Sequence, residues 1–253
     1  MNQLISQGCF CLCLLICITA LNADPRQING PSSPPWLNAV GKLEIPSQSL
    51  EAGDITYFTE HCSATLISAV PNRSANIIVT AWHCLENYRD LSREISFTLF
   101  YGEEAAISYS ARRLSSGGSL DLDWAILRLN KPISNSLVQA IVLDRKSLQT
   151  TDYPYITMAG YSRDIGLGGQ GKRLTYHADC ELGQEINQQI SSNCLVYKGA
   201  SGGPVVMSKF NNNGFQHKLA GVISQGNGLD VSTFIPTKAF ISTALRLIHS
   251  NKK

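Results

Sequence analysis

From Trp36 onward, short apolar or alternating runs follow one another along the chain, separated by turn-forming residues. Runs of about four to eight residues with a period of two are typical of β-strands, and only the last segment has the 3.6-residue period of an amphipathic helix. We predict strands at 38–43, 64–68, 77–80, 94–100, 106–111, 124–129, 155–160, 174–180, 194–197, 203–207, 218–224 and 232–235. This spacing indicates an all-β fold, built as a barrel or a sandwich.

The segment after the predicted strands has a different period. Phe240, Ile241, Ala244 and Ile248 would share one face of a helix, and Thr237 can cap its first turn. We therefore predict a short helix at the end of the chain.

The beginning of the chain has the layout of a secretory signal peptide. Residues 10–20 form an apolar run that ends near small residues, with Ala20 or Ala23 as cleavage points. A membrane anchor would need an apolar run of about 20 residues, which favours the signal peptide, residues 1–23. Residues 24–35 contain four prolines, so we predict an irregular leader or propeptide before a domain at 36–253.

Composition narrows the class of protein. The chain has 253 residues, of which 43% are hydrophobic and 16% charged, and its net charge is +2. These are the values of a globular protein with a sizeable core, and the charge is too small to indicate a nucleic acid or an anionic membrane as partner. We expect a secreted monomer, extracellular or periplasmic, with no cofactor, no nucleic acid and no membrane association after signal removal.

The cysteines support export. Four of the eight leave with the predicted signal peptide, and four remain in the mature chain: Cys62, Cys84, Cys180 and Cys194. An even number in an exported protein indicates disulfides. Zinc is the alternative, because His61, His83 and His177 stand close to these cysteines. The exported context and the lack of a Cys-x-x-Cys pair disfavour a metal, and we expect none.

The run from Cys194 to Pro204 contains a candidate nucleophile, Ser201. One glycine stands two residues before it and two follow it, so the backbone can turn tightly and leave the serine at a loop tip. A serine hydroxyl needs a base, an acceptor that orients the base, and fixed donors for the developing oxyanion. His83 and Asp123 are candidates for base and acceptor, and the amides of Gly199 and Ser201 for the donors.

These residues lie in three blocks: Thr-Ala-Trp-His-Cys at 80–84, Asp-Trp-Ala-Ile-Leu at 123–127 and Gly-Ala-Ser-Gly-Gly-Pro at 199–204. With them the chain resembles the trypsin and chymotrypsin superfamily of serine proteases, in which such blocks follow in this order. Three blocks about 40 and about 78 residues apart are far more specific than any one of them. Singly, each residue would more often be a turn former or a half-buried side chain.

The resemblance implies a fold and a set of roles. It implies two six-stranded antiparallel β-barrels facing each other across a cleft, the first at about 36–135 and the second, with a closing helix, at about 136–253. Ser201 would attack the scissile carbonyl, His83 would take and return the proton, and Asp123 would orient the histidine. Asp121 is the close competitor of Asp123, but the small Ala125 after Asp123 matches the family block.

The resemblance also implies the disulfide pairing. Cys62 and Cys84 match the family's bridge beside the catalytic histidine. Cys180 and Cys194 then pair by elimination, which would tie a strand to the nucleophile's loop.

The chain departs from the family pattern near the site and near its start. Trp82 replaces a small residue before the histidine, and Ala200 replaces the aspartate before the serine, as in many bacterial relatives. Arg26-Gln27-Ile28 resembles a degenerate form of the family's activation site, which is cleaved after Arg; cleavage here would free the amine of Gln27. Ala200 has no charge with which to pair with the amine that such a cleavage would free. We therefore expect the oxyanion loop to be held without a terminal ion pair. We also expect that removal of the leader does not activate the enzyme.

The resemblance also suggests a substrate pocket. Its base would be Leu195, beside Val196, and its opposite wall Ile223, Ser224, Gln225 and Gly226. None of these side chains is charged, and a buried charge on the substrate would need a partner. We therefore predict a preference for uncharged, apolar residues before the cut.

The sequence favours a secreted serine endopeptidase, and two alternatives remain open. One is a catalytically silent protease-like protein that binds or adheres through its surface. The other is an esterase that uses the same three residues, since acyl transfer does not dictate amide over ester.

Overall fold

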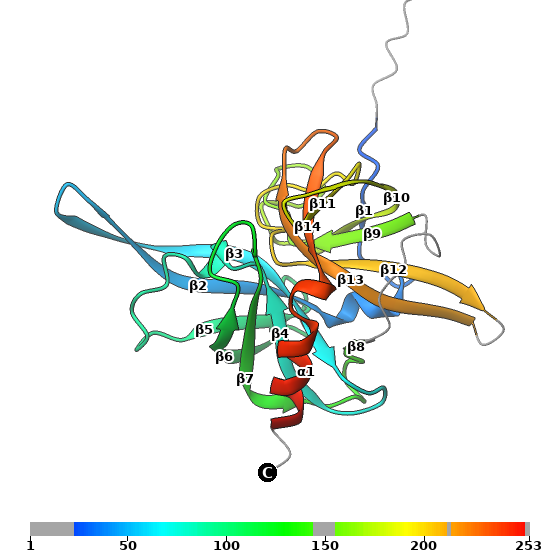
Figure 1. The fold of residues 1–253 in the computed structure, drawn as a ribbon, viewed down its shortest axis with the longest axis horizontal. Coiled ribbons are helices and arrows are strands. Elements are labelled where there is room, and N and C mark those ends of the chain that lie inside the picture. The colour runs from blue at the N-terminus through cyan, green and yellow to red at the C-terminus, as the bar shows by residue number, and fades with distance from the viewer. Residues whose placement is uncertain (1–22, 144–154, 212–213, 251–253) are drawn as a thin grey trace, which may run out of the picture.

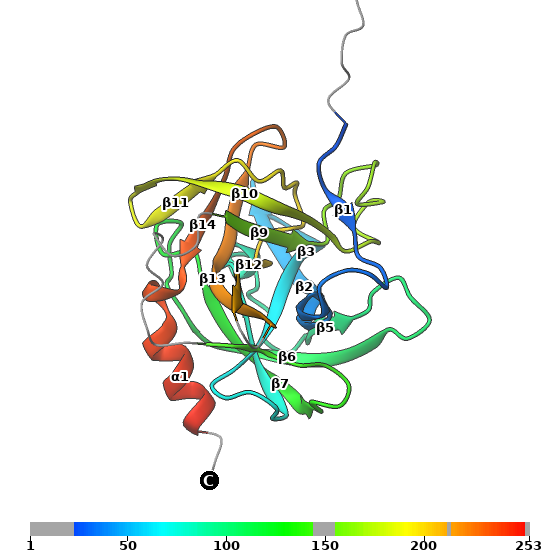
Figure 2. The ribbon, with the colours of Figure 1, turned by 90° about the vertical axis from the view of Figure 1, so that its right-hand side faces the viewer.

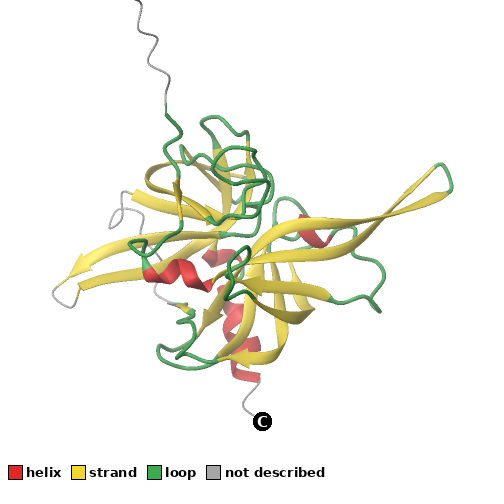
Figure 3. Cartoon of the chain, turned by 180° about the vertical axis from the view of Figure 1, so that it is seen from behind, coloured by secondary structure: helices red, strands yellow, loops and turns green. Residues whose placement is uncertain are grey.

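The computed structural model describes residues 23–143, 155–211 and 214–250, and strands make up most of it (Figure 3). The strands form two closed barrels, one above the other in Figure 1. The predicted signal peptide lies outside the described residues except for Ala23. Within the described part, the helices are too short or too polar to cross a bilayer.

The first barrel has six strands in the order β2-β5-β6-β7-β4-β3, and the pairing of β2 with β3 closes it. A short strand, β8 (Ile141–Val142), adds to β3 in parallel. The six barrel strands are β2 (Val40–Glu51), β3 (Asp54–Ser68), β4 (Ala75–Thr80), β5 (Ile95–Leu99), β6 (Ile107–Ser116) and β7 (Ala125–Ile133). Their inward-facing β-branched and aromatic side chains, such as Ile45, Ile78 and Phe97, are completely buried.

The second barrel has six strands in the order β10-β11-β14-β13-β12-β9, closed by the pairing of β10 with β9. These strands are β9 (Tyr155–Gly160), β10 (Thr175–Ile186), β11 (Gln189–Ser192), β12 (Pro204–Asn211), β13 (Gly214–Gly226) and β14 (Ser232–Pro236). The predicted fold of two six-stranded antiparallel barrels with a closing helix is therefore confirmed.

The segment at 24–35 is less irregular than the sequence suggests. It contains a strand, β1 (Gln27–Ile28), which pairs with β10 of the second barrel (Figure 2). The 3₁₀ helix η1 (Pro35–Ala39) follows, so β2 begins at Val40 instead of the predicted position 38.

Among the predicted strands, the one at 194–197 and the two that form the β2–β3 hairpin differ most from the structure. The strand predicted at 194–197 is wrong: β11 ends at Ser192, and the Cys194 and Leu195 amides donate to the Ser192 hydroxyl and the His177 ring instead of a neighbouring strand. The β2–β3 hairpin is much longer than predicted and projects from the barrel (Figure 1). Its outer part is solvated, so it lacks the buried alternation by which strands are recognised.

The closing helix, α1 (Ile241–His249), joins the two barrels. It follows the second barrel in sequence, but Arg128 of β7 in the first barrel donates a hydrogen bond to the carbonyl of Leu247 at 3.0 Å. Phe240 packs on Trp124 with ring centroids 6.0 Å apart. The prediction that Thr237 caps the helix is wrong, because Thr237 is buried in a preceding 3₁₀ turn, η4 (Thr237–Ala239).

Candidate active site

The first barrel brings His83 and Asp123 together. His83 opens the 3₁₀ turn η2 (His83–Leu85) after β4, and Asp123 precedes β7. Since Thr80 of β4 pairs with Ala125 of β7, both residues leave the sheet at the same end. His83 Nδ1 lies 2.8 Å from Asp123 Oδ2, and the His83 amide donates to Asp123 Oδ1 at 2.8 Å.

A third donor reaches the same carboxylate from the second barrel. The Ser224 hydroxyl, on β13, donates to Asp123 Oδ2 at 2.5 Å. Asp123 is completely buried, and a buried carboxylate is stable only when such donors satisfy it. The competing Asp121 is exposed. The sequence analysis assigned Ser224 to the pocket wall and missed this contact, since nothing local to Ser224 points to a partner 101 residues away.

Ser201 and His83 line one pocket of about 340 Å³. The Ser201 hydroxyl donates to the Ser224 carbonyl at 3.4 Å, and within the described part of the chain no hydrogen bond joins it to the His83 ring. His83 Nε2 and the Ser201 carbonyl oxygen each lie 3.9 Å from Cys84 Sγ, so the ring lies beside the nucleophile loop. Catalytic hydrogen bonds are often long or absent without substrate, so this geometry is compatible with His83 as the base of Ser201.

The peptide between Lys198 and Gly199 has a fixed orientation. The Arg163 amide donates to the Lys198 carbonyl at 2.7 Å. In a planar trans peptide the C=O and N–H point in opposite directions, so the Gly199 N–H points away from Arg163. No described residue accepts this N–H.

The next amide is set in the same way. The Gly203 N–H donates to the Ala200 carbonyl at 2.9 Å, which turns the Ser201 N–H away from Gly203. The described residues offer no acceptor for this N–H either. The Gly199 and Ser201 amides are therefore two oriented donors in the same loop that no described residue uses, which makes them candidates for an oxyanion hole.

Ser63 of the first barrel makes two hydrogen bonds to the loop that contains Ser201. Its amide donates to the Ser201 carbonyl and its hydroxyl to the Gly199 carbonyl, both at 2.8 Å. The same hydroxyl accepts the Tyr161 N–H at 2.9 Å. Ser63 is completely buried, on β3 next to Cys62. The sequence analysis missed it, because a serine in a strand carries no signal of such a role.

Two glycines allow the loop to lie this close. Gly199 and Gly202 have φ values of +98° and +82°, which side chains disfavour. A Cβ on Gly202 would also collide with Thr80 Oγ1 of the first barrel. The sequence analysis placed glycines here for a tight turn, and the structure adds this contact between barrels.

The predicted substrate pocket is only partly assembled as expected. Val196, Ile223, Ser224, Gln225 and Gly226 line the pocket of His83 and Ser201, and Leu195 does not. Leu195 is instead buried, with its amide bound to His177 Nδ1 at 2.8 Å. Burial lowers the pKa of His177, which keeps the ring neutral and able to accept this bond.

The four cysteines form two disulfides, Cys62–Cys84 and Cys180–Cys194, the pairs that the sequence analysis predicts. One joins β3 to the turn of His83, and the other joins β10 to the segment before the nucleophile loop. Of the three histidines considered for zinc, His83 and His177 each lie beside one of these bridges, in the clusters His83–Cys62–Cys84 and His177–Cys180–Cys194, and His61 belongs to neither cluster.

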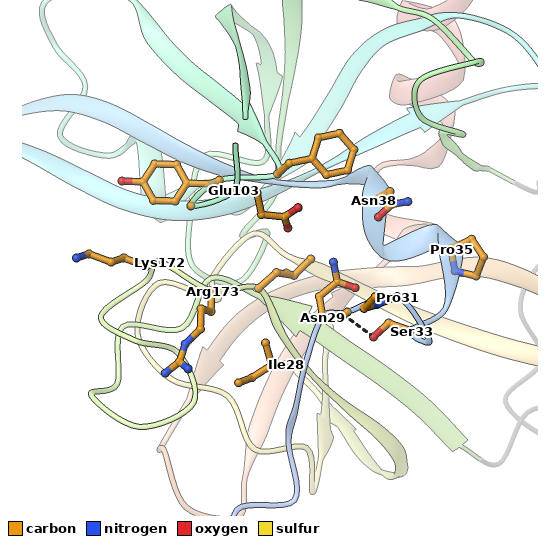
Figure 4. A pocket seen from close by; sticks show the side chains of 14 residues that line it. Ile28, Asn29, Pro31, Ser33, Pro35, Asn38, Glu103, Lys172 and Arg173 are labelled. Carbon is orange, nitrogen blue, oxygen red and sulfur yellow. Dashed lines mark hydrogen bonds between the residues drawn. The ribbon is translucent and has the colours of Figure 1, made fainter. Parts of the chain in front are cut away.

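A second, larger pocket of about 570 Å³ lies away from His83 and Ser201 (Figure 4). One wall is the segment from Ile28 to Pro35, and the others come from residues 100–103 of the first barrel and 172–174 of the second. The polar side chains of Asn29, Glu103, Lys172 and Arg173 line it. The pocket shows that the segment before η1 lies between the two barrels.

Comparison with known proteins gives a consistent result. The family model described as Trypsin matches residues 47–242. No curated protein sequence matches the chain. Among solved structures, the thermostable serine protease AL20 from an extremophilic microorganism has a TM-score of 0.63 at 18% identity, over 86% of this chain and 100% of that one. The protease Anisep from Arthrobacter nicotinovorans has a TM-score of 0.61 at 16% identity, over 87% of this chain and 99% of that one.

Proposed function

Because the chain belongs to the trypsin family and is a serine endopeptidase, we propose that Ser201, His83 and Asp123 are the residues with which it hydrolyses peptide bonds. The observation that supports this assignment most is that Ser201 and His83 line one pocket, while the buried Asp123 bonds to the His83 ring. The Gly199 and Ser201 amides, which no described residue uses, support it further.

Acylation starts at the Ser201 hydroxyl. Its proton passes to His83 Nε2 as Oγ attacks the substrate carbonyl carbon, and Asp123 holds the Nδ1 proton and stabilises the imidazolium. The resulting oxyanion lies against the Gly199 and Ser201 amides. His83 then gives its proton to the leaving amine, and the C–N bond breaks. Water releases the acyl group through the same steps, with His83 again as base.

The loop works without an aspartate before the nucleophile. Ala200 is 1% exposed and belongs to the apolar cluster of the second barrel, where it packs closely against Gly160. An apolar contact therefore occupies the position of the family's charged residue, and the hydrogen bonds of Ser63 and Arg163 hold the loop. This arrangement supports the interpretation as a variant that needs no terminal ion pair.

The pocket favours an uncharged, apolar side chain before the scissile bond. Val196, Ile223 and Gly226 supply its apolar walls, and Lys198 at the mouth is exposed. Val196 reaches so close to Gly226 that a Cβ there would lie 2.5 Å from Val196 Cγ2, which limits the depth of the pocket. No described carboxylate lines it to pair with Arg or Lys.

Export fits the same function. We propose that residues 1–23 are a signal peptide and that the enzyme acts outside the cell or in the periplasm as a monomer on proteins or peptides. Two disulfides support this location, since such bonds persist in oxidising compartments.

Reaction with a fluorophosphonate probe tests the proposed nucleophile. The wild-type enzyme is expected to be labelled and Ser201→Ala to remain unlabelled. Failure of the wild type to react, at a concentration that labels a reference serine protease, would refute the assignment and favour a silent binding protein.

Digestion of a peptide library tests the pocket. We expect cleavage after apolar residues, and Val196→Gly should favour larger ones, such as Phe over Val, by about tenfold in kcat/KM because the pocket deepens. Cleavage mainly after Arg, Lys or Glu would refute the apolar pocket. Turnover of esters without peptides would identify the enzyme as an esterase.

A further inference from the structure

Arg26 is a buried cation at the start of the described chain. Its side chain is 2% exposed, although it belongs to the segment that the sequence analysis treated as a removable leader. It stands immediately before β1, whose pairing with β10 fixes the backbone on the second barrel. A buried guanidinium is stable only with partners, so its contacts indicate what it holds.

Two carboxylates satisfy the guanidinium. Arg26 Nη1 and Nη2 donate to the two Asp164 oxygens at 2.8 and 2.9 Å. Nε and Nη2 donate to Asp24 at 3.0 and 2.5 Å. Hydrogen bonds from Arg26 lower the pKa of Asp24. Burial would raise the pKa of Asp164, but the bonds from Arg26 and from the Gly168 amide outweigh it and lower the pKa. Such paired, planar bonds are the strong form of ion pair.

The same guanidinium reaches the nucleophile loop. Its carbon lies 4.3 Å from the centre of the Tyr197 ring, within the range of a cation–π contact. Tyr197 stands four residues before Ser201, and its carbonyl accepts the Ala200 amide at 3.0 Å. Arg26 thus fixes the start of the turn that carries the nucleophile.

The second connection passes through Asp164. Its neighbour in sequence is Arg163, whose amide donates to the Lys198 carbonyl and thereby turns the Gly199 N–H away from Arg163. Arg163 Cγ also packs on Gly199, where a Cβ would lie 2.8 Å away. Arg26 therefore contacts both segment 163–164, through Asp164, and segment 197–200, through Tyr197. The hydrogen bond between these two segments sets the orientation of the Gly199 N–H.

From these contacts we infer that Arg26 is a positioning residue for the oxyanion hole and that the enzyme works with residues 24–28 attached. The inference rests on the proposed function. Arg26 acts through Asp164 and Tyr197 and does not touch the substrate pocket. The ion pair that orders the loop is internal to the uncut chain, and Ala200 takes no part in it.

In this chain, cleavage after Arg26 should have the opposite effect to cleavage at the corresponding activation site of the family. A cut after Arg26 would separate it from Gln27 and break the backbone at the edge of β1. Arg26 would then be the last residue of the released leader, and no covalent bond would link its guanidinium to β1. Cleavage there should release Arg26 and lower activity, whereas cleavage at the family's activation site raises it.

Three variants of the full chain test the inference at 25 °C, with activity expressed per fluorophosphonate-reactive site. Arg26→Ala should lower both kcat and the labelling rate by about 10- to 100-fold with little change in KM, because small misplacements of catalytic groups have effects of this size. Arg26→Lys should lie between it and the wild type, since Lys keeps the charge but not the forked donors. Arg112→Ala removes an exposed arginine of β6 and should leave kcat unchanged.

A melting curve of each variant separates positioning from stability. A merely structural Arg26 would lower Tm and leave kcat per reactive site at the wild-type value, which would overturn the inference. A wild type that is not labelled at all would instead overturn the proposed function. If the wild type is labelled and Arg26→Ala reacts equally fast, the proposed function holds and the proposed role of Arg26 is refuted.

The N-terminus of the reactive enzyme gives a test that needs no variant. The secreted protein is labelled with a biotinylated fluorophosphonate, captured, and its first residue is determined by mass spectrometry. We expect captured chains to retain Arg26. Captured chains that begin at Gln27, with uncut chains unreactive, would show activation by cleavage and overturn the inference.

Discussion

The two barrels contribute to the site in different ways. The first barrel presents the acid–base pair fully assembled, with Asp123 buried and bonded to the His83 amide and ring. The second barrel presents Ser201 on a loop whose conformation depends on residues outside it: Ser63 of the first barrel, Arg163 and Arg26. Ser224 bonds to both halves, since its hydroxyl donates to Asp123 and its carbonyl accepts the Ser201 hydroxyl.

This difference shows where the enzyme is sensitive to distant changes. The acid–base pair is set by two neighbouring strands and one disulfide. The nucleophile's loop needs two glycines with positive φ, hydrogen-bond donors from Ser63 and Arg163, and the contact of Arg26 with the Tyr197 ring. Substitutions far from the chemistry should therefore act mainly through the loop.

The largest expected effect shows that the two halves act as one unit. Ser201→Ala and His83→Ala should each lower kcat by about 10⁶, and the double variant should be no slower than either, because neither residue works without the other. The measurement is peptide hydrolysis by the four chains. A double variant slower by the product of the single effects would show two independent contributions.

A smaller effect is expected within the acid–base half. Asp123→Asn should lower kcat by about 10⁴, since the amide favours the wrong tautomer of His83. Ser224→Ala removes one of three donors and should cost far less. Equal losses from the two variants would contradict the assignment of Asp123 as the group that orients His83.

Ser63→Ala tests the dependence of the loop on the first barrel. Losing the bond to the Gly199 carbonyl should lower kcat by about 10- to 100-fold with KM nearly unchanged, and Ser63→Thr should restore most of it. Ser68→Ala is the matched control, because Ser68 is a buried serine of the same strand bonded to a backbone carbonyl away from the site. Wild-type kcat in Ser63→Ala would show that the loop holds itself.

The smallest expected effect is the loss of stability from the Arg26 ion pairs at low pH. The folded-state pKa values of Asp24 and Asp164 are lowered, so their pairing with Arg26 stabilises the fold above the unfolded value of about 3.9 and is lost as pH falls through the lower folded value. Compared with Asp164→Asn, the wild type should melt about 2 °C higher at pH 6, and this difference should vanish at low pH. His177 faces the same cluster and is present in both chains. A difference that grows on acidification would contradict the ion pair.

The sequence was enough to predict the two barrels, and it named three residues that the structure brings near one another. Period-two runs located most strands, and the blocks around His83, Asp123 and Ser201 stood out because the proposed chemistry requires those residue types. Contacts between distant segments were not predictable in this way. Ser63 and Arg26 act through hydrogen bonds to residues 136 and 138 positions away, and nothing local distinguishes them from an ordinary strand serine or a cleavage site.

The pocket shows the same limit. The family resemblance placed Leu195 at the base of the pocket by its position relative to Ser201 in the sequence. The bond of its amide to His177 takes the backbone out of the sheet. The position of Ser201 in the sequence therefore located the loop. Which loop residues line the pocket depends on contacts such as the hydrogen bond from the Leu195 amide to His177.

A crystal structure of the fluorophosphonate adduct tests the central claim most directly. The account predicts a bond from phosphorus to Ser201 Oγ, with the phosphoryl oxygen about 3 Å from the amide nitrogens of both Gly199 and Ser201. An adduct on another residue, or a phosphoryl oxygen turned away from both amides, would contradict it.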